Sequence, residues 1–175
     1  MIGNGGNVRC VGSTAGFVVV GAASFAVMEP ITALVHRTIM HGFGRALHRS
    51  HHRNVVARRS GEASTGSRWE ANDAYPFAFA AIVMIGLAVG FNVAGYHVLV
   101  PIGVGITAYG AAYALVHDVY THGRLPLFGD RRVRGFERLA AAHREHHLHN
   151  GAPYGMLVPV LSRSGSRPSH DPLDA

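Results

Sequence analysis

The chain has 175 residues, of which 48% are hydrophobic and only 15% are charged, whereas soluble domains average roughly 25% charged residues. This length suits one domain, and the shortage of charge points to a lipid environment. All 16 basic residues are arginine, against 10 acidic residues, and the single cysteine excludes a disulfide framework or a cysteine-rich metal site, whereas the 13 histidines need a functional explanation.

The first apolar run covers residues 11–35, close to the roughly 20 residues that cross a bilayer as a helix. Glu29-Pro30 interrupts it, so the run forms either one kinked span or a span followed by an interfacial helix. Only Arg9 precedes it, which favours a retained span over a signal peptide. Because an ionisable residue in an apolar run is costly, Glu29 is expected to hydrogen bond beside the site or to form a helix-end salt bridge.

Two histidine motifs follow this run. In the first, His36 and His41 are five residues apart; the second is His48-x2-His51-His52. Helix positions i, i+3 and i+4 share one face, so His48, His51 and His52 are predicted to converge on one point. Five steps of about 100° leave residues i and i+5 about 140° apart, so the second histidine of the first motif is expected beyond the end of its helix.

Two further apolar runs cover residues 75–92 and 98–116. Only five residues, 93–97, separate them, and these include Gly95, which breaks helices. The two runs are therefore predicted to form an antiparallel helical hairpin. Residues 1–161 are expected to form one membrane domain, and the polar residues 162–175 a disordered tail.

The histidine pattern then occurs a second time. His117 and His122 repeat the spacing of five, and His143-x2-His146-His147 repeats the second motif. Ten of the 13 histidines therefore belong to a duplicated arrangement. The other three lie outside it: His97, His149 and His170.

The arginines are distributed unevenly between the apolar runs. Seven lie between the first and second runs and eight after the third, but none lies in the hairpin. If each run crosses once, the arginine-rich segments and the histidine motifs emerge on one side, which the positive charge places in the cytoplasm. The basic charge then reports topology and not nucleic-acid binding. The prediction is an all-α integral membrane bundle of three to four membrane helices; buried helices of a globular protein are the alternative.

Ten imidazoles on one side of the membrane indicate a metal site. Imidazole suits iron, zinc, copper or nickel, and ten ligands suggest two ions with about five each and open positions for dioxygen or water. Two irons are favoured, because a zinc hydrolase would usually carry a carboxylate base as in His-Glu-x-x-His, which is absent, and haem needs only two histidines. Separately satisfied histidines, or unspecific metal binding at a membrane surface, remain the alternative.

Two carboxylates lie within the motifs, Asp118 and Glu145. Each could orient an imidazole by accepting its second ring N–H, although surface ion pairing is the commoner fate of such residues. No catalytic residue separate from the metal ligands is identified.

The motifs resemble those of the membrane-bound non-haem di-iron fatty acid hydroxylase superfamily and, within it, the bacterial β-carotene 3-hydroxylases. The resemblance extends from about residue 27 to 159 and includes short sequence segments in and between the motifs. These are Met28-Glu29, His36-Arg-Thr-Ile-Met-His-Gly-Phe-Gly, His48-Arg-Ser-His-His, Glu70-Ala-Asn-Asp-Ala-Tyr, Thr107-Ala-Tyr-Gly and Ala142-His-Arg-x-His-His.

This resemblance implies a specific reaction. The ten motif histidines would hold two Fe2+ ions, dioxygen would be the co-substrate, and reduced ferredoxin would supply electrons. One oxygen atom would be inserted at C3 of each β-ionone ring, converting β-carotene to β-cryptoxanthin and then zeaxanthin. The carotenoid would enter from the membrane lipids. Fatty-acid or sterol hydroxylation, and a non-enzymatic membrane metal-binding protein, are the alternatives.

Overall fold

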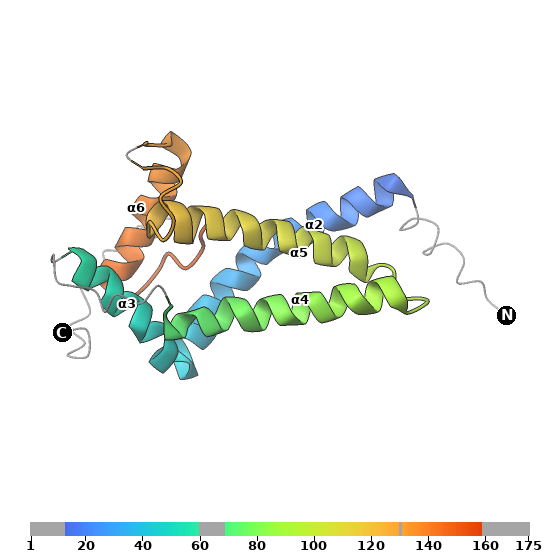
Figure 1. The fold of residues 1–175 in the computed structure, drawn as a ribbon, viewed down its shortest axis with the longest axis horizontal. Coiled ribbons are helices and arrows are strands. Elements are labelled where there is room, and N and C mark those ends of the chain that lie inside the picture. Colours follow the sequence, from blue (N-terminus) through green and yellow to red (C-terminus); the bar gives the residue numbers. More distant parts are fainter. Residues whose placement is uncertain (1–12, 60–68, 130, 159–175) are drawn as a thin grey trace. The chain divides into compact units, whose positions relative to one another are not determined.

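The computed structural model describes residues 13–59, 69–129 and 131–158. Within these ranges the regular structure is all helical, which confirms the predicted fold class; the expected tail, residues 162–175, lies outside them. In chain order the helices are α2 (Thr14–Val35), η1 (His36–Phe43), α3 (Arg45–Arg59), η2 (Ala71–Asp73), α4 (Ala74–Asn92), α5 (Leu99–Ala114), η3 (Leu115–Thr121) and α6 (Arg134–His149) (Figure 1).

The chain divides into two compact units, which are described separately. The first comprises Met1–Met28 and Pro76–Ala111, and the second comprises Glu29–Tyr75 and Ala112–Ala175. All ten motif histidines belong to the second unit, together with the acidic residues Glu29, Glu70 and Asp118.

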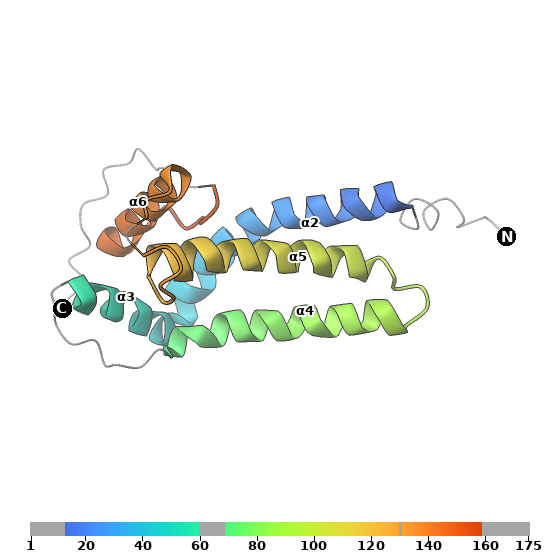
Figure 2. The same cartoon turned by 45° about the horizontal axis from the view of Figure 1, so that its top comes forward.

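In the first unit, α4 and α5 form the predicted antiparallel hairpin (Figures 1 and 2). Gly95 in the connecting turn has a φ of 87°, a conformation that glycine adopts without the strain a side chain would bring. His97 Nδ1–H donates to the carbonyl oxygen of Gly90 near the end of α4, at 3.0 Å. The turn is thus closed by an imidazole that lies outside the duplicated pattern.

Glycines also let α2 approach α5 closely in the first unit. A Cβ on Gly105 would collide with the carbonyl oxygen of Gly21 and would lie 3.0 Å from Ser24 Cβ. Nearby, the rings of Phe25 and Tyr109 meet edge to face, with centroids 5.7 Å apart. Small residues at a helix crossing and an aromatic contact beside it are typical of packing between membrane helices, where close backbone approach replaces the hydrophobic effect.

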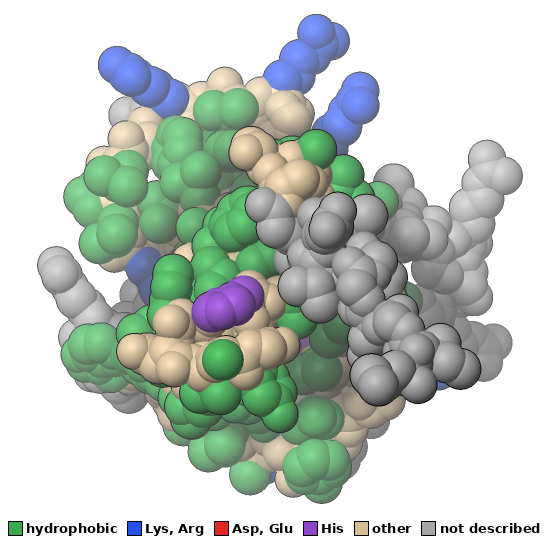
Figure 3. Space-filling model, turned by 90° about the vertical axis from the view of Figure 1, so that its right-hand side faces the viewer, with side chains coloured by type: hydrophobic (Ala, Val, Ile, Leu, Met, Phe, Trp, Pro, Cys, Tyr) green, Lys and Arg blue, Asp and Glu red, His purple; other side chains and the backbone are tan. Residues whose placement is uncertain are grey.

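Three helical stretches are long and apolar enough to cross a membrane: Thr14–Phe43, Ala71–Asn92 and Leu99–Thr121. Large apolar side chains on them are exposed; in α4, Ile82, Met84 and Ile85 expose 68%, 66% and 66% of their surface. Figure 3 shows hydrophobic side chains over most of the described atoms of one face. Such continuous apolar exposure is unfavourable in water and favourable in lipid.

The first apolar run forms one helix. α2 continues through Pro30 to Val35 without a break, and η1 follows it directly. A helix tolerates proline at the loss of one backbone hydrogen bond, especially where neighbouring groups can compensate in a membrane. Of the two alternatives left by the sequence, the continuous helix agrees with a single candidate span.

In the second unit, short elements position the polar residues. η1 and η3 are π-helices, each beginning with or near a motif histidine. Glu70 caps η2, because its backbone N–H donates to Asp73 Oδ2 at 2.9 Å and its own side chain accepts from the Asp73 backbone. α6 ends at Asn150, which adopts the left-handed conformation with a φ of 50°. The non-helical segment 150–158 follows.

Candidate metal centre

Eight of the ten motif histidines form two groups of four. In each group, every residue offers one ring nitrogen, and these nitrogens lie within 4.8 Å of one another. Most of the eight side chains are buried. The first group is His36, His41, His48 and His146; the second group is His51, His122, His143 and His147.

Each His-x2-His-His motif contributes to both groups, so the prediction that its three histidines converge on one point is wrong. His48 belongs to the first group and His51 to the second, and their ring centroids lie 5.7 Å apart. In α6, His146 belongs to the first group, whereas His143 and His147 belong to the second. His146 lies between His143 and His147 along α6 but points to a different side of the helix, because at about 100° per residue it is about 60° from His143 and about 100° from His147 around the axis. This angular separation lets one helix contribute to two sites.

The π-helices explain how histidines five residues apart meet. In η1 the rings of His36 and His41 lie 5.0 Å apart, and both belong to the first group. In η3 the backbone N–H of His122 donates to the carbonyl oxygen of His117 at 3.0 Å, a hydrogen bond that spans five residues. The expectation that His41 lies beyond its helix is therefore wrong, whereas His122 caps η3 and Gly123 follows with a φ of 62°.

In the first group, oxygen acceptors determine which ring nitrogen carries the proton. His36 Nδ1–H donates to the carbonyl oxygen of Tyr154 at 3.2 Å, and His146 Nδ1–H donates to that of Gly151 at 2.5 Å. His48 Nδ1–H donates to Asn72 Oδ1 at 2.8 Å. Because these oxygens only accept, the proton stays on Nδ1, and each Nε2 carries a lone pair.

Two of those lone pairs face each other, because His36 Nε2 lies 3.1 Å from His48 Nε2. The third, on His146 Nε2, lies 3.2 Å from His41 Nε2. Two neutral imidazoles with both protons on Nδ1 repel at this distance unless a cation lies between them. Nitrogens bound to one metal ion at about 2.1 Å are about 3.0–3.4 Å apart in octahedral or tetrahedral geometry. The first group therefore fits a metal ion.

The second group has the same character. His143 Nε2 lies 3.0 Å from His122 Nε2 and 2.8 Å from His147 Nε2. His51 Nδ1–H donates to Glu70 Oε2 at 3.0 Å, and His51 Nε2 is buried without a hydrogen-bond partner. A buried nitrogen with a lone pair is costly unless a ligand satisfies it, so a metal ion accounts for this group as well.

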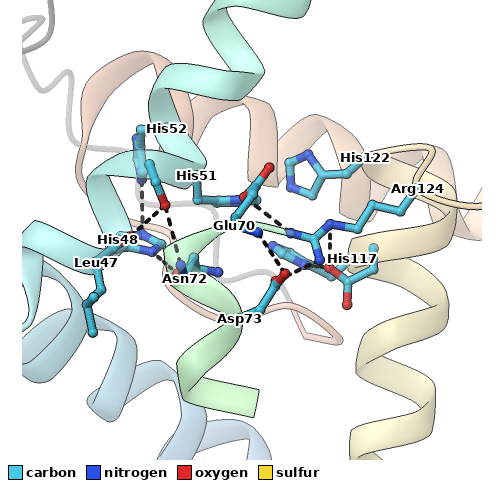
Figure 4. A network of polar contacts seen from close by, with 12 residues as sticks. Leu47, His48, His51, His52, Glu70, Asn72, Asp73, His117, His122 and Arg124 are labelled. Carbon is cyan, nitrogen blue, oxygen red and sulfur yellow. Dashed lines mark hydrogen bonds and ion pairs between the residues drawn. The ribbon is translucent and has the colours of Figure 1, made fainter. Parts of the chain in front are cut away.

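Arg124 joins the acidic residues beside the second group (Figure 4). Its guanidinium lies 2.7 Å from Asp73 Oδ1, 3.2 Å from Glu70 Oε2 and 3.7 Å from Asp118 Oδ1. The side chains of Glu70 and Asp73 are only 3% and 9% exposed. One arginine therefore compensates three carboxylates and holds Glu70 in place against His51.

The other two motif histidines lie at the edges of these groups. His52 Nε2 is 3.1 Å from His48 Nε2, and its ring lies 4.4 Å from that of His147 in the second group. The ring of His117 lies 4.5 Å from that of His122 and 4.7 Å from that of His143. His52 is thus adjacent to both groups and His117 to the second.

Burial keeps these imidazoles neutral, as metal ligands must be. Loss of hydration lowers the pKa of His48 and of His146 to about 4, and that of His52 to about 2, with the neighbouring His48 contributing to the last shift. Burial lowers the pKa values of His143 and His147 as well. At neutral pH, a metal ion therefore displaces no proton from these five rings.

Proteins of other organisms are similar in sequence to this chain over most of its length. The "Beta-carotene hydroxylase" of Pantoea ananas is 40% identical over 141 residues, which cover 78% of this chain and 74% of that protein. That of Pseudescherichia vulneris is 41% identical over 128 residues, 73% of this chain and 66% of that protein. The chain belongs to the beta-carotene hydroxylase family.

Plant members of the family are longer. The chloroplastic "Beta-carotene hydroxylase 1" of Capsicum annuum is 36% identical over 138 residues, which cover 75% of this chain but only 40% of the plant protein. No family model matches the chain, and no solved structure matches it. The two histidine groups of this hydroxylase family member fit a metal-dependent oxygenase.

The three carboxylates singled out from the sequence lie in different surroundings. Asp118 Oδ1 accepts from His117 Nδ1–H at 3.0 Å. Glu29 accepts from backbone N–H groups of residues 156–158. Glu145 pairs at 3.2 Å with His149, which is outside the motifs, and its side chain is 56% exposed. The contact of Glu145 is thus a surface ion pair with a histidine outside the motifs, the commoner of the two fates expected from the sequence.

Sequence reasoning missed several groups that orient ligands in this hydroxylase chain. The sequence points to Glu70, Asn72 and Asp73 only through the family resemblance, and it does not single out Arg124. The available signal was the position of these residues. Two acidic residues and an amide lie just before the second apolar run, and one arginine lies just after the third. The carbonyl oxygens of Gly151 and Tyr154 leave no signal of this kind, because every residue has one.

Proposed function

We propose that this protein is a β-carotene 3-hydroxylase that uses dioxygen to hydroxylate C3 of each β-ionone ring, giving β-cryptoxanthin and then zeaxanthin. Each step would consume one dioxygen, two electrons and two protons and release one water. The observation that carries the proposal is the pair of four-histidine groups, in a chain about 40% identical to bacterial proteins named for β-carotene hydroxylation.

The proposed ligands are the ten motif histidines, five for each of two iron ions. His52 would join His36, His41, His48 and His146, and His117 would join the second group; the hydrogen bonds at Nδ1 support binding through Nε2. Bound iron would supply reductive activation of dioxygen for insertion of one oxygen atom into a C–H bond. The chain itself would keep the ligand rings neutral and oriented. Asp118 would do so by accepting a hydrogen bond from His117, and Glu29 by binding backbone N–H groups of residues 156–158.

We further propose that the histidine motifs lie on the cytoplasmic side, where a ferredoxin-type donor would deliver electrons. The arginines support this orientation, because they flank the motif segments and are absent from residues 75–116. β-Carotene is a hydrocarbon that dissolves in lipid. Exposed apolar side chains along the candidate spans suit entry of such a substrate from the membrane.

Pigment analysis tests the reaction. Expression in cells that accumulate β-carotene should yield β-cryptoxanthin and zeaxanthin, each additional hydroxyl adding one oxygen to the mass. His51→Ala and His146→Ala each remove a ligand from one group, so both should abolish the products while the protein still inserts into membranes. His97→Ala, which removes an imidazole from the first unit, is the control and should retain activity.

The other outcomes separate the alternatives. Unchanged pigment together with hydroxylated fatty acids or sterols would indicate another activity of the superfamily. Metal uptake without oxygen consumption would indicate a metal-binding membrane protein. Full activity in both ligand variants would contradict the proposed metal centre.

A further inference from the structure

The segment 150–158 supplies two of the acceptors that orient the first histidine group. The carbonyl oxygen of Gly151 accepts from His146, and that of Tyr154 accepts from His36. The ring of Tyr154 also lies 5.4 Å from the rings of both His41 and His146. This segment has no regular secondary structure to hold it, so its position must come from contacts with the rest of the second unit.

Glu29 provides such contacts. Its Oε1 accepts the backbone N–H groups of Met156 at 2.8 Å and Val158 at 3.0 Å, and both of its oxygens accept that of Leu157, at 3.1 and 3.2 Å. Three amide donors compensate a carboxylate within an otherwise apolar helix, where an unsatisfied charge would be costly. Glu29 precedes His36 by seven residues, two helical turns.

Gly155 makes this approach feasible. A Cβ at residue 155 would lie 2.5 Å from Glu29 Oε1 and 3.2 Å from the carbonyl oxygen of Val158. Any larger residue would therefore push the carboxylate away from the amides. The glycine and the glutamate, 126 positions apart in the sequence, form one contact.

We propose that Glu29 is a positioning residue for the first histidine group: by binding the amides of residues 156–158, it holds the carbonyl oxygens that orient His36 and His146. It acts on one metal site and not the other, because the second group is oriented by Glu70 and Arg124. The inference rests on the proposed function only in that both groups bind metal.

The test measures metal as well as product. Glu29→Gln keeps the size of the side chain but replaces one acceptor oxygen with an NH2 group, and Gly155→Ala displaces the carboxylate without changing it. Because loss of groups that orient ligands typically weakens metal binding about 10–100-fold, both variants purified in detergent should bind one of their two iron ions that much more weakly. The remaining ion should give the electron paramagnetic resonance signal of an isolated ferric site.

Matched controls are available in α6. Glu145→Gln removes an exposed carboxylate, and Gly135→Ala adds a methyl group where nothing lies within 4 Å. Both should retain two ions with unchanged affinity. In double variants, Glu29→Gln should add little to the metal loss of His36→Ala, because both act on the first site, but should weaken binding of the remaining ion in His143→Ala.

Two results would overturn the inference. One is unchanged affinity for both ions in Glu29→Gln and Gly155→Ala. The other is failure of both variants to accumulate in membranes while the controls do, because the contact would then serve folding alone. The proposed function fails separately: a wild-type protein that binds two ions but does not hydroxylate β-carotene would refute it, and site-specific metal loss in Glu29→Gln would still support this inference.

Discussion

Individual acceptors distinguish the two histidine groups. In the first group the oxygens that receive Nδ1–H are neutral: two backbone carbonyls and the amide of Asn72. Beside the second group they are the carboxylates of Glu70 and Asp118. A carboxylate makes an imidazole a stronger donor to a metal than a carbonyl does. Arg124 moderates this effect, since its charge lies against both carboxylates.

Arg124 is therefore a sensitive residue of the second group. Arg124→Gln leaves the buried carboxylates of Glu70 and Asp73 without their cation, which should lower the free energy of unfolding by about 3 kcal/mol and the affinity of the second group for a metal ion about 10-fold or more. Thermal unfolding in detergent and metal analysis measure the two effects. Arg131→Gln, at an exposed position, is the control; equal behaviour of the two variants would contradict the role of Arg124.

The pKa shifts predict how the metal-free protein responds to acid. Folded His48 and His146 have pKa values near 4, below the 6.5 of an unfolded histidine, so between these values only the unfolded chain takes up protons. Stability is then complete above pH 6.5 and decreases as the pH falls towards 4, by up to about 1.4 kcal/mol per pH unit for each residue.

Thermal unfolding of the metal-free protein at pH 7.5, 6.5 and 5.5 measures this decrease. The melting temperature should be similar at the first two values and clearly lower at the third. Replacing His48 with Gln removes one titrating group, and its melting temperature should depend less on pH. A melting temperature independent of pH over this range would show that these imidazoles are not buried as described.

At this scale the sequence predicted the histidines better than their partners. Residue type and spacing are visible in a sequence, so His48-x2-His51-His52 and its repeat could be singled out in advance as candidate ligands. Tyr154 and Gly151 act through backbone oxygens, which no side chain reveals. Assignment of each histidine to a group depends on which histidines of other elements its side of α3 or α6 meets, and the spacing within one helix does not supply those partners.

Among the elements, the π-helices were the feature that helical periodicity could not predict. The spacing of His36 and His41 was interpreted with α-helical geometry, which directs the two rings apart, whereas a hydrogen bond spanning five residues brings such pairs together. The hairpin of α4 and α5 was predictable because Gly95 interrupts two long apolar runs.

The crossing of α2 and α5 makes a prediction about element packing. Gly105→Ala would force the backbones apart at Gly21 and should lower stability by about 1–3 kcal/mol. Gly110→Ala lies in the same helix with nothing within 4 Å of the added methyl, and should be neutral or stabilise by up to about 1 kcal/mol through helix propensity. Thermal unfolding in detergent compares them; equal stability would contradict close packing at Gly105.

For the whole molecule, the spans and the arginines make a joint prediction. The chain reaches one histidine-bearing segment before α4 and the other after α5, so one candidate span lies between the hairpin turn and each segment. With seven arginines between α2 and α4 and eight after η3, the positive charge favours the cytoplasm for both segments and the opposite side for the hairpin turn.

Reporter fusions measure this topology. Alkaline phosphatase inserted after Gly95 should be active, because it folds only outside the cytoplasm, and green fluorescent protein fused after Ala175 should fluoresce, because it matures in the cytoplasm. The exchanged pair of fusions should both be inactive. If both sites reported the same side, the second and third spans could not both cross the membrane once. The predicted topology would then not place the two sets of histidine motifs on the same side of the membrane.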